Sequence, residues 1–171
     1  MLFSQLFALF LHSCNNYFME KLDSLRQVAD FHTTFGHPIL PVPTVPAAER
    51  SALRISLLQE ELDELKEAVD ANDIVGIADA LCDLQYVLSG AVLEFGLGQK
   101  FKALFDEVQR SNMSKACKTK EEAEQTMAHY KTKGTNSFYE EKDGLFLVYR
   151  EGDRKTLKSV FYSEADLKGL L

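Results

Sequence analysis

The sequence has 171 residues, of which 46% are hydrophobic and twelve are phenylalanine, enough for one compact domain with its own core. A formal net charge of −7 argues against a nucleic acid polymer as partner and against binding to an anionic membrane surface. The three cysteines, Cys14, Cys82 and Cys117, lack metal-ligand spacing and are typical of reduced thiols. We therefore expect a cytoplasmic protein.

The first eighteen residues hold an apolar run of roughly ten residues, which is too short to span a bilayer. They also lack the basic start and the small-residue cleavage site of a signal peptide. We predict that residues 1–18 form a non-core N-terminal extension and that the protein has no membrane partner.

Apolar residues at helical spacing predict a mainly α protein. Four helices of sufficient length are typical of a four-helix-bundle-type core, which we place within residues 19–134. Gly36 ends the first helix, and Pro38, Pro41, Pro43 and Pro46 then predict an extended loop. The predicted helices are 19–36, 48–71, a third from Asn72 or Asp73 to Phe95, 99–113, and a short polar helix within 118–133.

The last part of the chain, residues 135–171, changes to a β-rich pattern. Two runs, 144–149 and 157–162, are joined by the polar segment 150–155, which predicts a β-hairpin. We treat this hairpin as a small C-terminal appendage that packs on the helices or on a partner.

The predicted helix that ends near Phe95 is apolar nearly all round, which is typical of a buried helix. Asp79 and Asp83 stack one turn apart on it, opposite the stripe that contains Leu81, so we expect them to face protein rather than water. A buried carboxylate needs a partner, and few cationic side chains lie nearby in sequence. The pair is either bonded to backbone or to Lys or Arg, or it binds a metal ion, and we favour the metal.

The preceding helix carries a second acidic group, Glu60, Glu61 and Glu64. Acidic runs on helices are usually solvated faces, and Glu60 alone would be interpreted in that way. Carboxylates on two neighbouring helices, however, form the oxygen-rich ligand set that suits Mg²⁺ or Mn²⁺. The two groups together favour a metal site.

The acidic pattern resembles that of the all-α nucleoside triphosphate pyrophosphohydrolases, which include MazG-like and phosphoribosyl-ATP pyrophosphohydrolase-like enzymes. The segments DALCDLQYVLSGAVLEFGL, FDEVQRSNMSK and LVYREGDRKTLKSVFYSEADL are similar to the latter branch, and the resemblance covers roughly residues 20–168. The MazG pattern usually ends in Glu-x-x-Asp, whereas this chain has Ala80 at the Glu position. We predict that Asp79, one residue earlier, supplies the missing carboxylate.

The resemblance implies cleavage of a nucleoside triphosphate, often a deoxynucleotide, between its α and β phosphates. It assigns Mg²⁺ binding to Glu61, Glu64, Asp79 and Asp83, and a catalytic role to Glu60 and Glu61, with Glu60 orienting or deprotonating the attacking water. The predicted substrate-binding residues are His32, Arg110, Asn112 and Lys115. For His32 the alternative is a packed or surface histidine, and for Arg110 and Lys115 it is solvated charge at a helix C-terminus.

The third helix has more apolar surface than the bundle of one chain can bury, so we expect a homodimer or homotetramer.

Three other functions compete with nucleoside triphosphate hydrolysis. The first is phosphoribosyl-ATP hydrolysis by the same fold. The second is a non-enzymatic helical interaction module. The third is a di-iron bundle, which would need Glu-x-x-His pairs that the acidic stretches lack.

Overall fold

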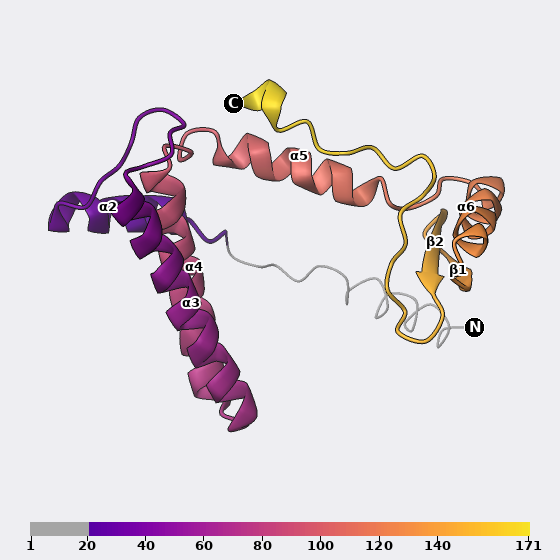
Figure 1. The fold of residues 1–171 in the computed structure, drawn as a ribbon, viewed down its shortest axis with the longest axis horizontal. Helices are drawn as coiled ribbons and strands as arrows, with labels where there is room; N and C mark the ends of the chain where they lie inside the picture. Colours follow the sequence, from indigo (N-terminus) through magenta and orange to yellow (C-terminus); the bar gives the residue numbers. More distant parts are fainter. Residues whose placement is uncertain (1–20) are drawn as a thin grey trace, which may run out of the picture. The chain divides into compact units, whose positions relative to one another are not determined.

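The computed structural model describes residues 21–171, so the predicted extension at 1–18 lies outside the described residues. The described chain is mainly α with a two-stranded antiparallel hairpin, which confirms the predicted fold class (Figure 1). Its elements are α2 (Ser24–Phe35), α3 (Ala48–Asp70), α4 (Ile74–Glu94), α5 (Phe101–Met113), α6 (Lys120–Thr132), β1 (Ser137–Lys142), β2 (Leu145–Arg150) and the 3-10 helix η1 (Lys168–Leu170).

The helices begin and end at the signals that the sequence contains. The Asp23 side chain accepts a hydrogen bond from the Arg26 amide at the start of α2, and Gly36 ends this helix with a left-handed φ of 71°. Asp73 caps α4, because its Oδ1 accepts a hydrogen bond from the Val75 amide at 3.0 Å. These side chains satisfy backbone groups that would otherwise lack a partner at the helix ends.

The chain divides into two compact units. The first unit combines the described residues up to Ile39 with Ala47–Ala91, and the second combines Leu40–Pro46 with Val92–Leu171. The boundary that we predicted after residue 134 therefore falls inside the second unit.

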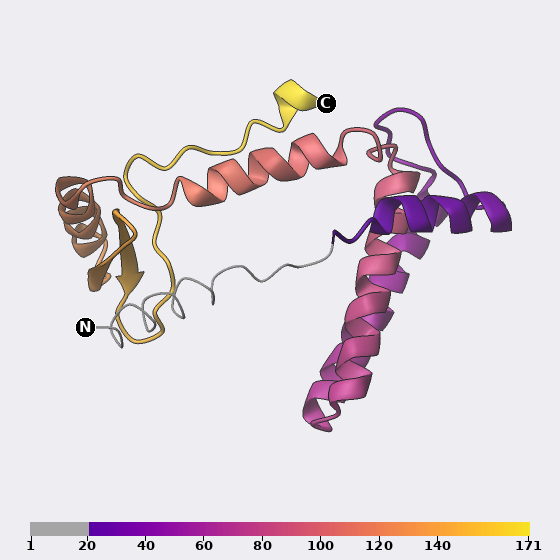
Figure 2. The same ribbon diagram turned by 180° about the vertical axis from the view of Figure 1, so that it is seen from behind.

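In the first unit, α3 and α4 lie side by side and α2 crosses them near one end (Figures 1 and 2). Polar contacts fix α2 in this position: the Ser89 hydroxyl lies 3.1 Å from the Ser24 hydroxyl, and Arg54 Nη2 lies 3.2 Å from His32 Nε2. Val28 and Ala80 are buried in this unit. The three helices of the first unit are thus held together where α2 crosses α3 and α4.

Much of the apolar surface of α3 and α4 is exposed in the single chain, which corrects the expectation of a helix buried on all sides. Leu81, which belongs to the apolar stripe of the helix that we expected to be buried, is 51% exposed, and Leu62 of α3 is 50% exposed. The physical reason is that α3 and α2 cover only part of α4. By length and composition α4 is apolar enough to cross a membrane, a property that it shares with core helices of soluble proteins.

In the second unit, α6 and the hairpin enclose a small core. Cys117, Ala123, Val148 and Leu157 are buried there, and Met127 and Tyr130 are among the side chains that pack against them. Cys82 and Cys117 have free thiols, and Cys14 lies outside the described residues.

The hairpin has a different partner strand from the one we predicted. The run 144–149 is a strand as expected, but β2 pairs with β1, so that Ser137 lies opposite Arg150 and Lys142 opposite Leu145. The run 157–162 is not a strand. The Arg150 amide of β2 donates to the Lys155 carbonyl, and the Leu157 amide donates to the Val148 carbonyl, before the chain leaves the sheet. The sequence signal for the true hairpin is Asp143-Gly144, since both residues have the positive φ values, 52° and 77°, that a tight hairpin turn requires.

The proline-rich segment between α2 and α3 is an extended loop, as predicted. Its Leu40 amide donates to the Leu93 carbonyl at 3.1 Å, and its Thr44 amide donates to the Phe95 carbonyl at 3.0 Å. The segment therefore runs against the C-terminal end of α4 and is held there by backbone hydrogen bonds.

Candidate active site

Two neighbouring helices of the first unit bring five carboxylates into one electrostatic environment. Glu60, Glu61 and Glu64 lie on α3, and Asp79 and Asp83 lie on α4. Burial raises the pKa of Glu61, and the charges of Asp83, Glu64, Glu60 and Asp79 raise it further, in that order. A carboxyl group whose pKa rises because of four other carboxylates lies within a concentrated negative field.

The side chains of this acidic cluster are open to solvent. Glu61 is half-buried, whereas Asp79 and Asp83 are exposed in the single chain. The expectation that these two aspartates face protein is therefore wrong for the described chain, and it failed because α4 is covered on fewer sides than its composition predicted. Ala80 is only 3% exposed. A carboxylate at position 80 would therefore point into the core, whereas Asp79 points outward together with Asp83.

The donor chemistry of the acidic cluster fits a hard divalent cation. Within residues 21–171, none of the five carboxylates forms a hydrogen bond or an ion pair. With the side chains in the positions that the structure gives them, no three His, Cys, Asp or Glu residues of the described chain are close enough together to hold a metal ion. Carboxylates repel one another unless a cation lies between them, so separate orientations are expected for these flexible groups. The metal-binding roles of Glu61, Glu64, Asp79 and Asp83 stay predictions.

His32 is a packed histidine, only 2% exposed. Its Nδ1 lies 2.9 Å from the Pro38 carbonyl oxygen, which can only accept a hydrogen bond. Its Nε2 lies 3.2 Å from Arg54 Nη2, which can only donate. Both contacts are satisfied when the imidazole is neutral with its proton on Nδ1. His32 thus connects α2 to α3, and sequence reasoning did not foresee its pairing with Arg54.

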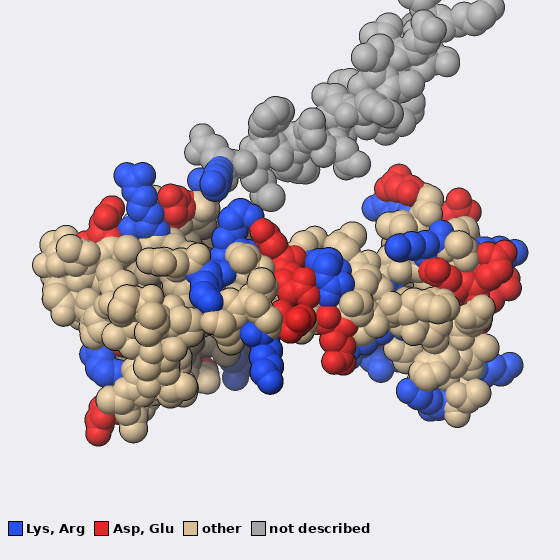
Figure 3. Space-filling view, turned by 90° about the horizontal axis from the view of Figure 1, so that it is seen from above, with Lys and Arg blue, Asp and Glu red and all other residues tan. Residues whose placement is uncertain are grey.

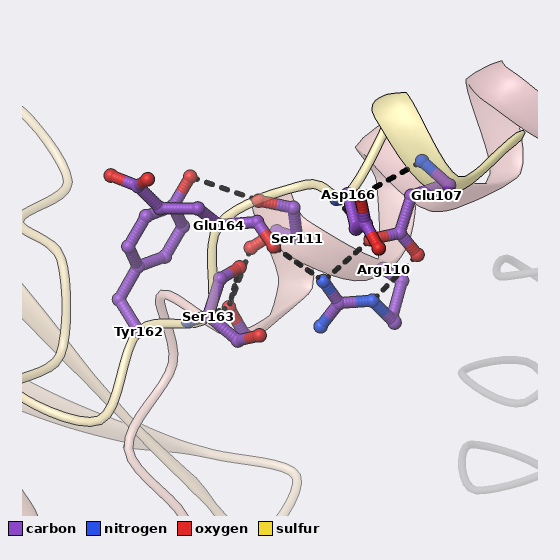
Figure 4. Close-up of polar contacts among 9 residues, drawn as sticks. Glu107, Arg110, Ser111, Tyr162, Ser163, Glu164 and Asp166 are labelled. Carbon is purple, nitrogen blue, oxygen red and sulfur yellow. Dashed lines mark hydrogen bonds and ion pairs between the residues drawn. The ribbon is translucent and has the colours of Figure 1, made fainter. Parts of the chain in front are cut away.

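The other predicted substrate-binding residues belong to the second unit, at the end of α5. Arg110 donates from Nε and Nη2 to the Glu107 carboxylate at 2.8 Å, and Nη2 also donates to the Glu164 carbonyl at 2.8 Å (Figure 4). The hydrogen bond from Arg110 lowers the pKa of Glu107 to about 2, and the Asp166 amide lowers it too. Lys115 Nζ donates to Asn112 Oδ1 at 2.7 Å. Asn112 is exposed and Lys115 half-buried, so both offer polar atoms to a ligand.

The C-terminal segment holds the RSNMSK motif in place along α5, a feature that sequence reasoning missed. The Ser111 and Tyr162 hydroxyls are 2.9 Å apart, and the Ser163 amide donates to Ser114 Oγ at 3.0 Å (Figure 4). Acidic and basic side chains lie side by side over α5 and this segment (Figure 3). We call residues 159–171 the C-terminal strap. It had been predicted in part as a strand, and its contacts span about fifty residues of sequence, a separation that periodicity cannot reveal.

Comparison with known proteins agrees with the acidic pattern. Residues 28–112, which include α3, α4 and most of α5, match the family model of phosphoribosyl-ATP pyrophosphohydrolase. An uncharacterized protein of Acanthamoeba polyphaga mimivirus is 31% identical over 100 residues. That alignment covers 56% of this chain and 40% of the relative, so the chain spans less than half of the relative's length.

The matched region contains the whole acidic cluster, His32, Arg110 and Asn112, and ends before Lys115. The match supports a pyrophosphohydrolase, an enzyme that hydrolyses an acid anhydride. Residues 28–112 are thus a match to the phosphoribosyl-ATP pyrophosphohydrolases of the MazG-like all-α nucleoside triphosphate pyrophosphohydrolase superfamily.

Proposed function

We propose that the protein hydrolyses a nucleoside triphosphate, with deoxynucleotides as the preferred class, to the nucleoside monophosphate and pyrophosphate with Mg²⁺ as cofactor. The observation that carries this proposal is the acidic cluster of α3 and α4, in which burial and then the charges of the other four carboxylates raise the pKa of Glu61. Such a cluster repels a polyphosphate on its own, so it can serve a nucleotide substrate only together with a divalent cation.

The members of the acidic cluster have two proposed roles, metal binding and activation of water. Glu61, Glu64, Asp79 and Asp83 would hold Mg²⁺ or, alternatively, Mn²⁺, through their carboxylate oxygens. When bound, the ion supplies charge stabilisation to the phosphate oxygens. Glu60 is exposed beside these residues and would orient the attacking water and accept its proton. The raised pKa of Glu61 makes that carboxylate a second candidate to hold a proton.

At the end of α5, Asn112 and Lys115 are the proposed contacts to the phosphates or the sugar. Their side chains bond to each other, and both present donors that suit phosphate oxygens. Arg110, which bonds to Glu107 and to the Glu164 carbonyl, would keep the motif in one conformation and could contact a phosphate only with part of its guanidinium group. His32 would contribute to the site indirectly, because its contact with Arg54 joins α2 to α3.

A screen of pyrophosphate release tests the proposed reaction. The four dNTPs, the four NTPs and phosphoribosyl-ATP would each be incubated with the full chain and Mg²⁺ or Mn²⁺. Release from dNTPs above that from phosphoribosyl-ATP is the expected result. Phosphoribosyl-ATP is the second candidate substrate because the matching family is described by that activity. If no substrate releases pyrophosphate with either ion, the enzymatic proposal is wrong, and a non-enzymatic interaction module takes its place.

We also propose a homodimer or homotetramer. In the first unit α4 exposes large apolar side chains that a single chain leaves in water, among them Val75 at 75%, Leu81 at 51% and Leu88 at 41%. Large apolar side chains exposed in this way are typical of subunit contacts. Replacing Leu81 by Glu should shift the mass measured by light scattering toward the monomer, whereas Val160→Glu in the second unit should not.

A further inference from the structure

The first unit contains a pocket that the proposed chemistry does not yet use. It has a volume of about 220 Å³ and lies where α2 crosses α3 and α4. A drug-sized ligand usually occupies about 300–1,000 Å³, so this pocket suits one ring system rather than a whole nucleotide. Its lining includes Phe31, His32 and His37 near α2, Arg54 and Leu57 on α3, and Tyr86 on α4.

The pocket continues the helix faces that carry the acidic cluster. On α3 a single stripe with alternating steps of three and four residues contains Arg50, Arg54, Leu57, Glu61 and Glu64. On α4 the corresponding stripe contains Asp79, Asp83, Tyr86 and Gly90. Leu57 therefore lies one turn from Glu61, and Tyr86 nearly one turn from Asp83, a rise of about 5 Å along each helix. The pocket and the acidic cluster are therefore adjacent along the same faces of α3 and α4.

We propose that this pocket receives the base of the nucleotide whose phosphates lie at the acidic cluster. The proposal rests on the proposed function for the position of the phosphates, and it adds the recognition of a planar heterocyclic ring. A sugar separates base from phosphates in every nucleotide, and the short distance between pocket and cluster along the helices accommodates such a spacer.

Aromatic side chains form the walls of the pocket. The rings of Phe31 and Tyr86 meet edge to face with centroids 5.6 Å apart, and His37 stacks on Phe31 at 5.6 Å with an interplanar angle of 16°. Phe31 and Tyr86 are each 37% exposed, so part of each ring remains accessible. Stacking on aromatic side chains accepts any base, because every base has a π face. Leu57 adds an apolar contact to the lining.

The floor of the pocket consists of two buried side chains. His32 and Arg54 are 2% and 7% exposed, and their hydrogen bond joins α2 to α3. Gly90 of α4 makes room for them, since a Cβ atom there would lie 2.8 Å from Arg54 Nη1 and 3.1 Å from His32 Nε2. A site whose floor is fixed before binding loses little conformational entropy when a ring enters.

The first experiment detects the base without catalysis. Saturation-transfer NMR would be recorded on the full chain with dAMP, dGMP, dCMP and dTMP in metal-free buffer. Base protons of at least one monophosphate should receive more saturation than its sugar protons. Phe31→Leu and Tyr86→Leu keep apolar bulk but remove the ring, and each should reduce that signal severalfold. Phe105→Leu, a 62% exposed aromatic of α5, is the matched control and should leave it unchanged.

The second experiment measures recognition of the base separately from recognition of the phosphates in the active enzyme. For the best triphosphate, KM should rise about tenfold in Phe31→Leu and Tyr86→Leu, the size expected for the loss of one stacking contact. Inhibition by inorganic tripolyphosphate, which has no base, should stay within twofold of wild type. An unchanged nucleotide KM, or an equal weakening of tripolyphosphate, overturns the pocket assignment while the proposed reaction stands. If no nucleotide is hydrolysed, the monophosphate spectra still decide the pocket, and absence of base saturation for all four overturns it.

Discussion

Asp83 is an exposed carboxylate on α4, and after burial it is the strongest contributor to the raised pKa of Glu61. Asp83→Asn keeps the shape of the side chain and removes one charge from the acidic cluster. Without metal, the thermal midpoint should stay the same or rise slightly, because one repulsion is lost and no ion pair of the described chain is broken. Pyrophosphate release with Mg²⁺ should fall by about 100-fold or more, as for other losses of transition-state charge stabilisation.

Asp70→Asn provides the control, since Asp70 is an exposed aspartate at the end of α3 and is not among the charges that raise the pKa of Glu61. It should leave both quantities unchanged. An Asp83→Asn protein that melts much earlier but hydrolyses normally per folded molecule would show that Asp83 has a structural role instead.

Glu107 holds the C-terminal strap through the Asp166 amide and bonds to Arg110. Its pKa is lowered from 4.5 to about 2, so the folded state favours the charged carboxylate. The resulting stabilisation is complete above pH 4.5 and is lost as the pH falls toward about 2. Between these values the thermal midpoint of the wild type should fall more steeply than that of Glu107→Gln. Asp106→Asn, which removes only an exposed ion pair with Lys102, should follow the wild type.

At the level of residues, sequence predicts contacts within one helix better than contacts between distant segments. The spacing of Glu61 and Glu64, and of Asp79 and Asp83, placed each pair on one helix face, because the helical period alone decides this. The bond between His32 and Arg54 depends on how two helices cross, and no local pattern contains that information. The same holds for the contacts of the C-terminal strap with α5.

At the level of elements, the bounds of α3, α4, α5 and α6 were predicted to within about two residues, since capping residues, glycines and prolines mark them. The start of the first helix was predicted at residue 19, whereas α2 begins at Ser24, after its cap Asp23. The hairpin was predicted with the wrong partner strand. Residues 157–162 have high β propensity but leave the sheet after Leu157, and β1, SFYEEK, is polar enough to be overlooked. The Asp143-Gly144 turn is the stronger signal, because turn chemistry fixes which strands pair.

Two glycines with nearly equal backbone conformation allow a test of packing at the end of α4. Gly36 and Gly96 have φ values of 71° and 68°. A Cβ atom at Gly36 meets nothing within 4 Å, whereas at Gly96 it would lie 1.8 Å from the Val42 carbonyl oxygen of the proline-rich loop. Gly36→Ala should therefore cost about 1–2 kcal/mol in unfolding free energy from the left-handed backbone alone. Gly96→Ala should cost about 3 kcal/mol or more, because steric overlap is added.

Urea unfolding of the two variants measures this difference. Equal destabilisation would show that the loop moves away from α4 without cost. A larger loss for Gly96→Ala would show that the backbone hydrogen bonds of Leu40 and Thr44 hold the loop against the helix end.

For the whole molecule, composition gives the number of apolar side chains, but it does not tell whether they are buried by the same chain or by another subunit. Leu62, Val75, Leu81 and Leu88 are all at least 41% exposed in the single chain. Hydrophobic periodicity identifies an apolar helix face, but the pattern is the same whether that face packs in the core or against another subunit. That ambiguity explains why α4 was expected to be buried and why Asp79 and Asp83 were expected to face protein.

Thermal stability of the whole molecule should depend jointly on Mg²⁺ and pH. Because the pKa of Glu61 is raised, the folded state binds more protons than the unfolded state as the pH rises through this region, and stability falls. Mg²⁺ should relieve the repulsion among the carboxylates of the acidic cluster when these groups are charged. At pH 8, free Mg²⁺ at a hundred times its Kd should stabilise the fold by about 2.7 kcal/mol. At pH 5 the stabilisation should be smaller, because protons compete for Glu61.

The measurement is a thermal midpoint at both pH values with millimolar MgCl₂, compared with NaCl at the same ionic strength so that charge screening is held constant. Asp83→Asn should lose most of the Mg²⁺ response, and Asp70→Asn should keep it. A wild-type midpoint that responds equally to MgCl₂ and NaCl at pH 8 would mean that the acidic cluster binds no divalent cation. In that case the carboxylates of α3 and α4 would be a solvated face, and the pyrophosphohydrolase chemistry would need a different metal site.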